Sequence, residues 1–267
     1  MKHDQLCATT LLYHPFPLER ALSGIANVGI TRVELAALVG FCDHAAPERL
    51  GFRASTVLSR LLRDHDLTAV SLSGHADLSW EYGVRAMADR LKLASDMGIA
   101  IVSTTSTGEP GPQAESRFYM NIAPLAELAG KLGVVIAIES GGPLTATGQA
   151  CARAVEKIDH PNVRINYDTA NPIFQCGVRP EGDIAAAMPY MVHMHIKDKA
   201  SMELERWDFS PIGSGIIDWD VIMGELDRAG FSGPASIESY LDGHPETPEI
   251  ADDALHQSFK FLSRYLH

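Results

Sequence analysis

The sequence predicts an α/β fold, a (β/α)8 TIM barrel with eight parallel strands in a single domain. Three observations predict it. Short apolar segments rich in β-branched residues alternate with longer segments of helical periodicity from one end of the chain to the other. The alternation repeats roughly every 30 residues, as βα units do, and eight units of about 33 residues account for all 267 residues. Several helical segments also stop at a glycine just before the next strand.

Eight segments have the length and composition of buried strands. They are residues 6–13, 32–36, 67–72, 99–104, 134–139, 163–168, 191–197 and 235–238. The segments between them carry Leu, Ile, Ala and Val at helical spacing. The predicted helices are residues 17–28, 54–64, 81–97, 114–132, 146–158, 219–229 and 251–265.

Glycines mark four of the expected helix ends: Gly29, Gly98, Gly133 and Gly230. A glycine just past a helix adopts the left-handed conformation that closes the last turn. An open doubly wound sheet is the alternative arrangement, but its nucleotide-binding versions carry G-x-G-x-x-G after the first strand or a G-x-x-x-x-G-K-[ST] loop, and the sequence has neither. No linker or low-complexity tract divides the chain, so we expect one domain over residues 1–267.

Composition limits the partners and the compartment. The 34 acidic residues outnumber the 22 Lys and Arg residues, giving a net charge of -12. This charge repels phosphate backbones and argues against nucleic acid. The first apolar run ends too early for a signal peptide or a membrane span, so we expect no membrane association. The four cysteines form no C-x-x-C pair, so we expect no disulfide framework and a cytoplasmic location.

The last four predicted strands each end near an acid or an imidazole: Glu139, Asp168, His195 and Glu238. Active sites of α/β barrels lie at the carboxyl ends of the strands, so these side chains should meet at one rim. Three carboxylates and one imidazole suit one divalent ion, Mn²⁺ first and Mg²⁺ or Co²⁺ as alternatives, better than a structural zinc. Without a cation the three carboxylates would repel one another and raise their pKa values.

Five short segments carry a resemblance to a known family: residues 138–140, 166–171, 193–199, 212–215 and 236–238. They resemble the sugar phosphate isomerase/epimerase family of the xylose isomerase-like TIM barrel superfamily, which includes ketose 3-epimerases, hydroxypyruvate isomerase, inosose dehydratase and, more distantly, endonuclease IV. The resemblance implies that Glu139, Asp168, His195 and Glu238 hold one metal ion. It also implies self-association, as a homodimer or a homotetramer. One departure concerns Asn171, which stands where the ketose 3-epimerases carry a histidine.

These residue types suggest a mechanism based on proton transfer. A metal ion can bind two adjacent oxygens of a hydroxy-ketone, polarise the carbonyl and stabilise a cis-enediolate. Glu139 and Glu238, from different strands, are the expected catalytic residues, because one can remove the proton and the other can return it. Two acting carboxylates would give epimerisation, and one carboxylate moving the proton to the adjacent carbon would give isomerisation. His193 lies two residues before His195, so its side chain should also point inward, one layer deeper in the barrel. We expect it to pack in the core or to support a metal ligand.

Six further residues are candidate substrate ligands: His14, Glu34, His75, Asn171, Lys197 and Arg206. Lys197 shares the inward parity of His195 and could stabilise an enolate oxygen, or form a salt bridge with Asp198 or Glu34. The segment 213–215 could cradle a phosphate through backbone N–H groups, or form a tight turn into a helix capped by Asp218. A phosphorylated substrate is therefore left open.

The expected function is a metal-dependent sugar isomerase or epimerase that acts on a small ketose, aldose or sugar derivative. The alternative is a lyase, an inosose dehydratase-like dehydration on the same metal site. Two distant alternatives are an endonuclease IV-like nuclease, which the charge disfavours, and a metal-independent glycosidase that uses Glu139 and Glu238. The expected partner is a small-molecule sugar substrate.

Overall fold

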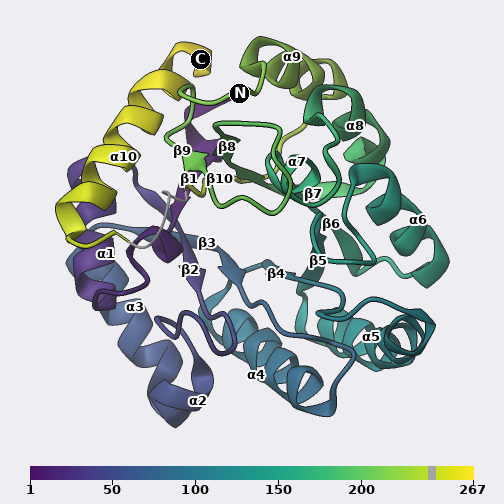
Figure 1. The fold of residues 1–267 in the computed structure, drawn as a ribbon. Coiled ribbons are helices and arrows are strands. Elements are labelled where there is room, and N and C mark those ends of the chain that lie inside the picture. Colours follow the sequence, from purple (N-terminus) through teal and green to yellow (C-terminus); the bar gives the residue numbers. More distant parts are fainter. Residues whose placement is uncertain (240–244) are drawn as a thin grey trace.

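The computed structural model describes residues 1–239 and 245–267. Eight parallel strands close into a barrel, and helices surround it (Figure 1). The barrel order is β1-β10-β7-β6-β5-β4-β3-β2. The strands are β1 (Leu6–Thr9), β2 (Arg32–Ala36), β3 (Thr68–Ser73), β4 (Ile101–Thr104), β5 (Val135–Glu139), β6 (Val163–Asp168), β7 (Met191–Ile196) and β10 (Ala235–Ile237). The predicted (β/α)8 TIM barrel is confirmed.

The first strand is shorter than predicted. It ends at Thr9, and Thr10–Tyr13 form a 3₁₀-helix, η2. The Thr9 hydroxyl accepts a hydrogen bond from the Leu11 backbone N–H at 3.2 Å, which caps η2 and turns the chain away from the sheet. All four η2 residues are buried, so the apolar pattern of the strand continues across this boundary. The predicted strand over residues 6–13 is therefore wrong beyond Thr9.

Seven helices correspond to the predicted ones, and all of them lie in the outer ring in Figure 1. They are α1 (Leu18–Asn27), α3 (Ala54–Asp64), α4 (Glu81–Met97), α5 (Pro112–Leu132), α6 (Gly148–Ile158), α9 (Trp219–Ala229) and α10 (Pro248–Leu262). Three shorter helices were not predicted: α2 (Pro47–Leu50), α7 (Asn171–Cys176) and α8 (Pro180–Ala187). Each has a proline in its first turn, where its missing N–H costs nothing.

The predicted glycine caps are confirmed. Gly98, Gly133 and Gly230 adopt the left-handed conformation, with φ of 71°, 68° and 66°. Gly29 follows α1 with φ of 91°. Left-handed backbone is strained for residues with a Cβ, so these glycines allow each helix to turn directly into the next strand.

A two-stranded hairpin follows β7 directly. β8 (Asp198–Lys199) pairs antiparallel with β9 (Phe209–Ser210), and we call these two short strands the β8–β9 stem. The Asp198 carboxylate accepts hydrogen bonds from the backbone N–H groups of Gly213 at 2.9 Å and Gly215 at 3.1 Å. It also accepts one from the Trp219 indole at 3.0 Å.

This arrangement decides how the segment 213–215 is used. Its N–H groups are bonded to a protein carboxylate, and a Cβ on Gly215 would lie 2.1 Å from Asp198 Oδ1. The Asp218 side chain caps α9 by accepting from the Val221 N–H at 3.2 Å. The segment is thus the tight turn of the two alternatives, and its glycines permit the close approach of Asp198.

Within residues 1–239 and 245–267, none of the helices combines the length and the apolar character that a membrane crossing requires.

Candidate metal centre

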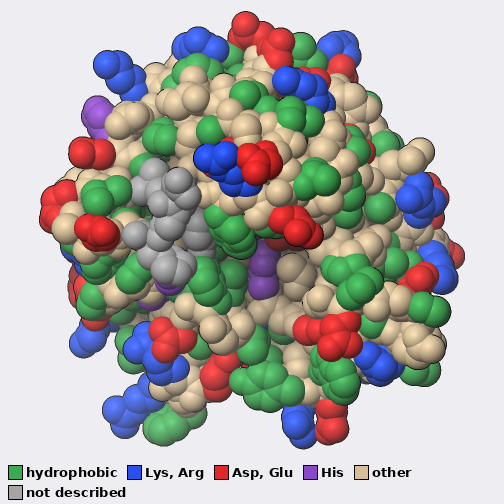
Figure 2. Space-filling model, in the orientation of Figure 1, with side chains coloured by type: hydrophobic (Ala, Val, Ile, Leu, Met, Phe, Trp, Pro, Cys, Tyr) green, Lys and Arg blue, Asp and Glu red, His purple; other side chains and the backbone are tan. Residues whose placement is uncertain are grey.

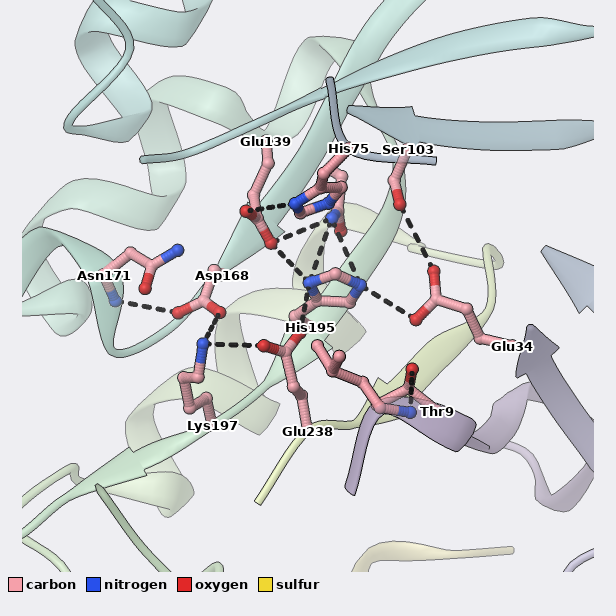
Figure 3. Close-up of polar contacts among 12 residues, drawn as sticks. Thr9, Glu34, His75, Ser103, Glu139, Asp168, Asn171, His195, Lys197 and Glu238 are labelled. Atoms are coloured by element: carbon pink, nitrogen blue, oxygen red, sulfur yellow. Dashed lines mark hydrogen bonds and ion pairs between the residues drawn. The ribbon is translucent and has the colours of Figure 1, made fainter. Parts of the chain in front are cut away.

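Four side chains meet at the carboxyl ends of neighbouring barrel strands. Glu139 and Asp168 are the last residues of β5 and β6, His195 lies near the end of β7, and Glu238 directly follows β10. The strand register places His195 beside both Asp168 and Ser236. One ligand atom from each of the four side chains lies within 4.8 Å of the others, and all four residues are buried (Figure 3). We call these four residues the metal cluster.

His195 lies at the middle of the metal cluster. Its Nδ1 atom is 2.5 Å from Glu139 Oε1 and 2.7 Å from Glu238 Oε2. Its other nitrogen, Nε2, is 2.9 Å from Glu34 Oε2. Although burial alone would lower the pKa of His195, the surrounding carboxylates Glu34, Glu238 and Glu139 raise it well above its usual value. The metal-free cluster therefore holds a proton at this ring.

The contacts around Nδ1 fit a cation. Oε2 of Glu238 is buried and has no hydrogen-bond partner among the described residues. It lies 2.7 Å from His195 Nδ1. Two carboxylate oxygens this close to one imidazole nitrogen require a positive charge there, which the protonated ring supplies in the metal-free protein and which a divalent ion would supply when bound. Three carboxylates and an imidazole are also a donor set that Mn²⁺, Mg²⁺ or Co²⁺ accept, so the residues fit a divalent ion.

Asp168 is held by local backbone groups. Its Oδ1 atom accepts hydrogen bonds from the N–H groups of Ala170 at 2.7 Å and Asn171 at 2.8 Å. Burial, with repulsion from Glu139 and Glu238, raises the pKa of Asp168 to about 6 even though Lys197 opposes the change. These two backbone contacts orient the carboxylate so that its Oδ2 atom faces the centre of the metal cluster (Figure 3).

Lys197 bridges two members of the metal cluster. Its ammonium lies 2.8 Å from Glu238 Oε1 and 3.2 Å from Asp168 Oδ2, and the side chain is 7% exposed. Burial would lower its pKa, but these carboxylates raise it, so Lys197 stays charged. Its salt bridges therefore involve Asp168 and Glu238, where the sequence suggested Asp198 or Glu34 as partners.

His75 lies close to the metal cluster. Its Nδ1 atom is 3.8 Å from Glu139 Oε2, and its Nε2 atom is buried without a hydrogen-bond partner in the described part of the chain. Its ring is stacked on that of His195, with 6.2 Å between centroids. Figure 2 shows histidine side chains (purple) at the bottom of a hollow in the centre of this face. Its Nε2 atom, without a partner among the described residues, leaves His75 available to a ligand beside Glu139.

The other candidate substrate ligands occupy varied positions. Asn171 uses its amide N–H to bond Ser140 O at 3.0 Å, which ties α7 to the end of β5. His14 stacks on Phe41 with 4.6 Å between ring centroids. Arg206 is exposed and pairs with Glu203 at 2.8 Å. The backbone N–H of Asn171 also donates to Asp168 Oδ1 at 2.8 Å. The roles of these three residues in substrate binding stay predictions.

Glu34 lies beneath the metal cluster, fully buried. Besides its contact with His195, it accepts a hydrogen bond from the Ser103 hydroxyl at 3.3 Å. Although burial opposes ionisation, attraction from His195 and His193 lowers the pKa of Glu34 to about 2. In this position Glu34 contacts a candidate metal ligand, whereas the sequence suggested contact with sugar hydroxyls.

The layer of side chains beneath the metal cluster also contains a chain of hydrogen bonds through His193 and Asn166. His193 is fully buried, with Nδ1 2.9 Å from Asn166 Oδ1 and Nε2 2.9 Å from Ser71 Oγ. Asn166 in turn donates to Glu139 Oε1 at 3.4 Å. Sequence reasoning placed His193 one layer deeper but missed Asn166, Ser71 and Ser103. Asn166 precedes Asp168 by two residues on β6, so its inward parity was a usable signal.

Comparison with known proteins agrees with this fold. Residues 25–264 match a family model described as xylose isomerase-like TIM barrel, and the chain belongs to that family. A 3-dehydroshikimate dehydratase of Bacillus anthracis is 25% identical over 130 residues, which cover 43% of this chain and 46% of that protein. A probable L-ribulose-5-phosphate 3-epimerase of Mycoplasma pneumoniae is 25% identical over 178 residues, 64% of this chain and 57% of that protein. The matches thus span about half the length of these relatives.

Solved structures resemble the whole chain. The D-allulose 3-epimerase of a Methylomonas species has a TM-score of 0.77 and 17% identity, with 98% of both chains covered. A probable 3-DHS dehydratase involved in petrobactin synthesis in Bacillus anthracis has a TM-score of 0.77 and 19% identity, with 98% of this chain and 99% of that chain covered. At these identities the likeness establishes the barrel fold.

Proposed function

We propose that this protein is a divalent-metal-dependent enzyme that transfers a proton next to the carbonyl of a small sugar or sugar derivative, as an isomerase or epimerase. The observation that carries the proposal is the metal cluster: three buried carboxylates and one imidazole with ligand atoms within 4.8 Å of one another. The neighbouring relatives add support, because they include sugar 3-epimerases. Mn²⁺ is the metal that we propose, with Mg²⁺ and Co²⁺ as alternatives.

The chain's own residues would divide the chemistry. A bound divalent ion would polarise the substrate carbonyl and stabilise the negative charge that forms on its oxygen. Glu139 and Glu238 would exchange the proton on carbon, one removing it and the other returning it. Lys197, held beside Glu238, would keep a positive charge close to the developing enolate. Asp168, anchored by two backbone N–H groups, would hold its place as a ligand.

A dehydratase is the second candidate, because both the curated relative and the solved structure from Bacillus anthracis are named as 3-dehydroshikimate (3-DHS) dehydratases. In this reaction a carboxylate of the metal cluster removes the proton next to the carbonyl. The hydroxyl on the following carbon then leaves as water after it takes a proton from a nearby donor. His75, 3.8 Å from Glu139 and without a partner on Nε2 among the described residues, is placed to be that donor.

The test uses purified, manganese-loaded protein and a panel of ketoses and keto-sugar derivatives in D₂O. An isomerase or epimerase incorporates deuterium into a product of unchanged elemental composition, whereas a dehydratase releases a product that lacks one water. Removal of the metal with a chelator should abolish either activity, and adding Mn²⁺ should restore it. Activity that survives complete metal removal would refute the proposed metal dependence.

Variants connect the activity to the two proposed catalytic carboxylates. Glu139→Gln and Glu238→Gln should each lower kcat about 100- to 10,000-fold, the usual contribution of a positioned acid or base. Glu127→Gln is the control, because Glu127 lies on the outer helix α5 with a 69% exposed side chain. Circular dichroism checks that all variants fold. A double Glu139→Gln, Glu238→Gln variant with full activity would contradict the assignment.

A further inference from the structure

A second group of possible ligands lies just beneath the metal cluster. Glu34, His193 and His195 have ligand atoms within 4.8 Å of one another, and all three are buried. The hydrogen bonds argue against a second metal ion there. Both nitrogens of His193 are already bonded, to Asn166 and Ser71, and the Nε2 atom of His195 is bonded to Glu34. The role of this group therefore lies in its contacts with the metal cluster above it.

Glu34 is placed to control the ring of His195. Its Oε2 atom lies 2.9 Å from His195 Nε2, and its Oε1 atom accepts from Ser103 Oγ at 3.3 Å (Figure 3). Glu34 comes from β2, across the barrel from β7, and is 0% exposed. A carboxylate without access to water keeps its orientation through such contacts. Since solvent cannot replace them, Glu34 has one stable way to face the ring.

The contact decides which nitrogen of His195 carries hydrogen. A carboxylate can only accept, and both ring nitrogens of His195 face carboxylates, so in the metal-free ring Nε2 donates to Glu34 and Nδ1 donates to Glu139. A divalent ion among the carboxylates of the metal cluster would take the place of the hydrogen on Nδ1, whereas Nε2 would keep its hydrogen for Glu34. In the metal-bound ring the lone pair of Nδ1 would then point toward Glu139 and Glu238. We propose that Glu34 is a positioning residue, which fixes the tautomer and the orientation of His195 for metal binding through Nδ1. The inference rests on the proposed metal site and assigns it a supporting carboxylate.

The first experiment uses the wild-type protein. With Zn²⁺ as a diamagnetic probe, ¹⁵N NMR of the histidine side chains reports which nitrogen carries a proton. Signals are assigned with a His195→Gln variant, and His193→Gln separates the neighbouring ring. We expect a proton on Nε2 and none on Nδ1 of His195. A proton on Nδ1 would overturn the proposal, and this measurement does not depend on any Glu34 variant.

The second experiment measures metal affinity directly. Glu34→Gln keeps the side-chain size but removes the charge, and its amide can present N–H₂ to the ring and so favour the opposite tautomer. The dissociation constant for Mn²⁺, measured by calorimetry, should rise about 10- to 100-fold, the usual effect of losing such a supporting carboxylate. The visible absorption of the Co²⁺-loaded protein should shift as well, because the ligand field at Nδ1 changes.

A matched control separates this role from a general effect of losing a buried carboxylate. Asp183 is also buried, but it caps α6 through the Gly148 N–H and accepts from the Tyr167 hydroxyl at 3.0 Å. Asp183→Asn should therefore lower thermal stability while leaving the Mn²⁺ dissociation constant unchanged. Glu34→Gln with wild-type Mn²⁺ affinity would refute the positioning role. Wild-type protein that binds no divalent ion would instead refute the proposed function.

Discussion

Lys197 offers a sharp test of the charge arrangement at the metal cluster. Its ammonium lies between Glu238 at 2.8 Å and Asp168 at 3.2 Å, away from water. Lys197→Met removes the charge and keeps an unbranched side chain of similar length. The two carboxylates then face each other without the cation that separates them. We expect the metal-free variant to be less stable than the wild type, because each carboxylate loses a buried partner.

The size of the loss follows from these distances. At an effective dielectric constant of about 20, one charge pair at 2.8 Å contributes roughly 6 kcal/mol of Coulomb attraction. Desolvation of both charges offsets part of this attraction, and breaking a buried pair from one side typically costs about 3–5 kcal/mol. For a chain of this size, each kcal/mol lowers Tm by roughly 2–4 °C, so a decrease of about 10 °C is expected. A bound divalent ion would again separate the two carboxylates, so saturating Mn²⁺ should reduce the difference.

The assay compares thermal unfolding of metal-free and Mn²⁺-saturated wild type, Lys197→Met and Lys199→Met. Lys199 is also fully buried, in the hairpin that follows β7. Its ion pair is with Asp208 of that hairpin and not with a carboxylate of the metal cluster. Lys199→Met should lose stability to the same extent with and without Mn²⁺. If metal-free Lys197→Met unfolds at the same temperature as the metal-free wild type, the reasoning is refuted. An equal rescue of both variants by Mn²⁺ would refute it too.

Two further predictions concern the scaffold. Gly215→Ala should lower stability by about 1–3 kcal/mol, because its Cβ would meet Asp198, while Gly182→Ala, with open space at its Cβ, should not; equal urea midpoints would contradict this. Burial opposes ionisation of Asp252, but its hydrogen bonds to Arg20 lower its pKa, so the folded state loses stability as pH falls below the unfolded value of about 4. Urea unfolding between pH 3 and 6 should then show a smaller acid loss for Asp252→Asn than for the wild type.

Much of the fold could be predicted because its signals are local. Each strand is a short apolar run, and Gly98, Gly133 and Gly230 mark helix ends by a conformation that few other residues adopt. The end of β1 could not be predicted, because burial in η2 continues the same apolar pattern. The short helices α7 and α8 were hidden in a proline-rich stretch that lacks a long periodic run.

The metal cluster could be anticipated because its four members end consecutive barrel strands, so topology alone brings them together. The supporting layer could not. Glu34 and Ser103 lie far apart in sequence, and their contacts depend on the closed cross-section of the barrel. The partners of Lys197 also required coordinates, since its long side chain could reach either Asp198 on its own strand end or Glu238 on the next strand.

The β8–β9 stem separates residues that the fold requires from residues that can vary. Asp198 fastens the base of the stem to the turn at 213–215 and to Trp219, immediately after the strand that carries His195. The intervening residues 200–208, among them Met202, Leu204 and Trp207, are largely exposed. Insertions or exchanges in this loop can therefore accumulate without moving the metal cluster. A library randomised between Ala200 and Leu204 should therefore yield folded proteins whose Mn²⁺ affinity stays that of the wild type.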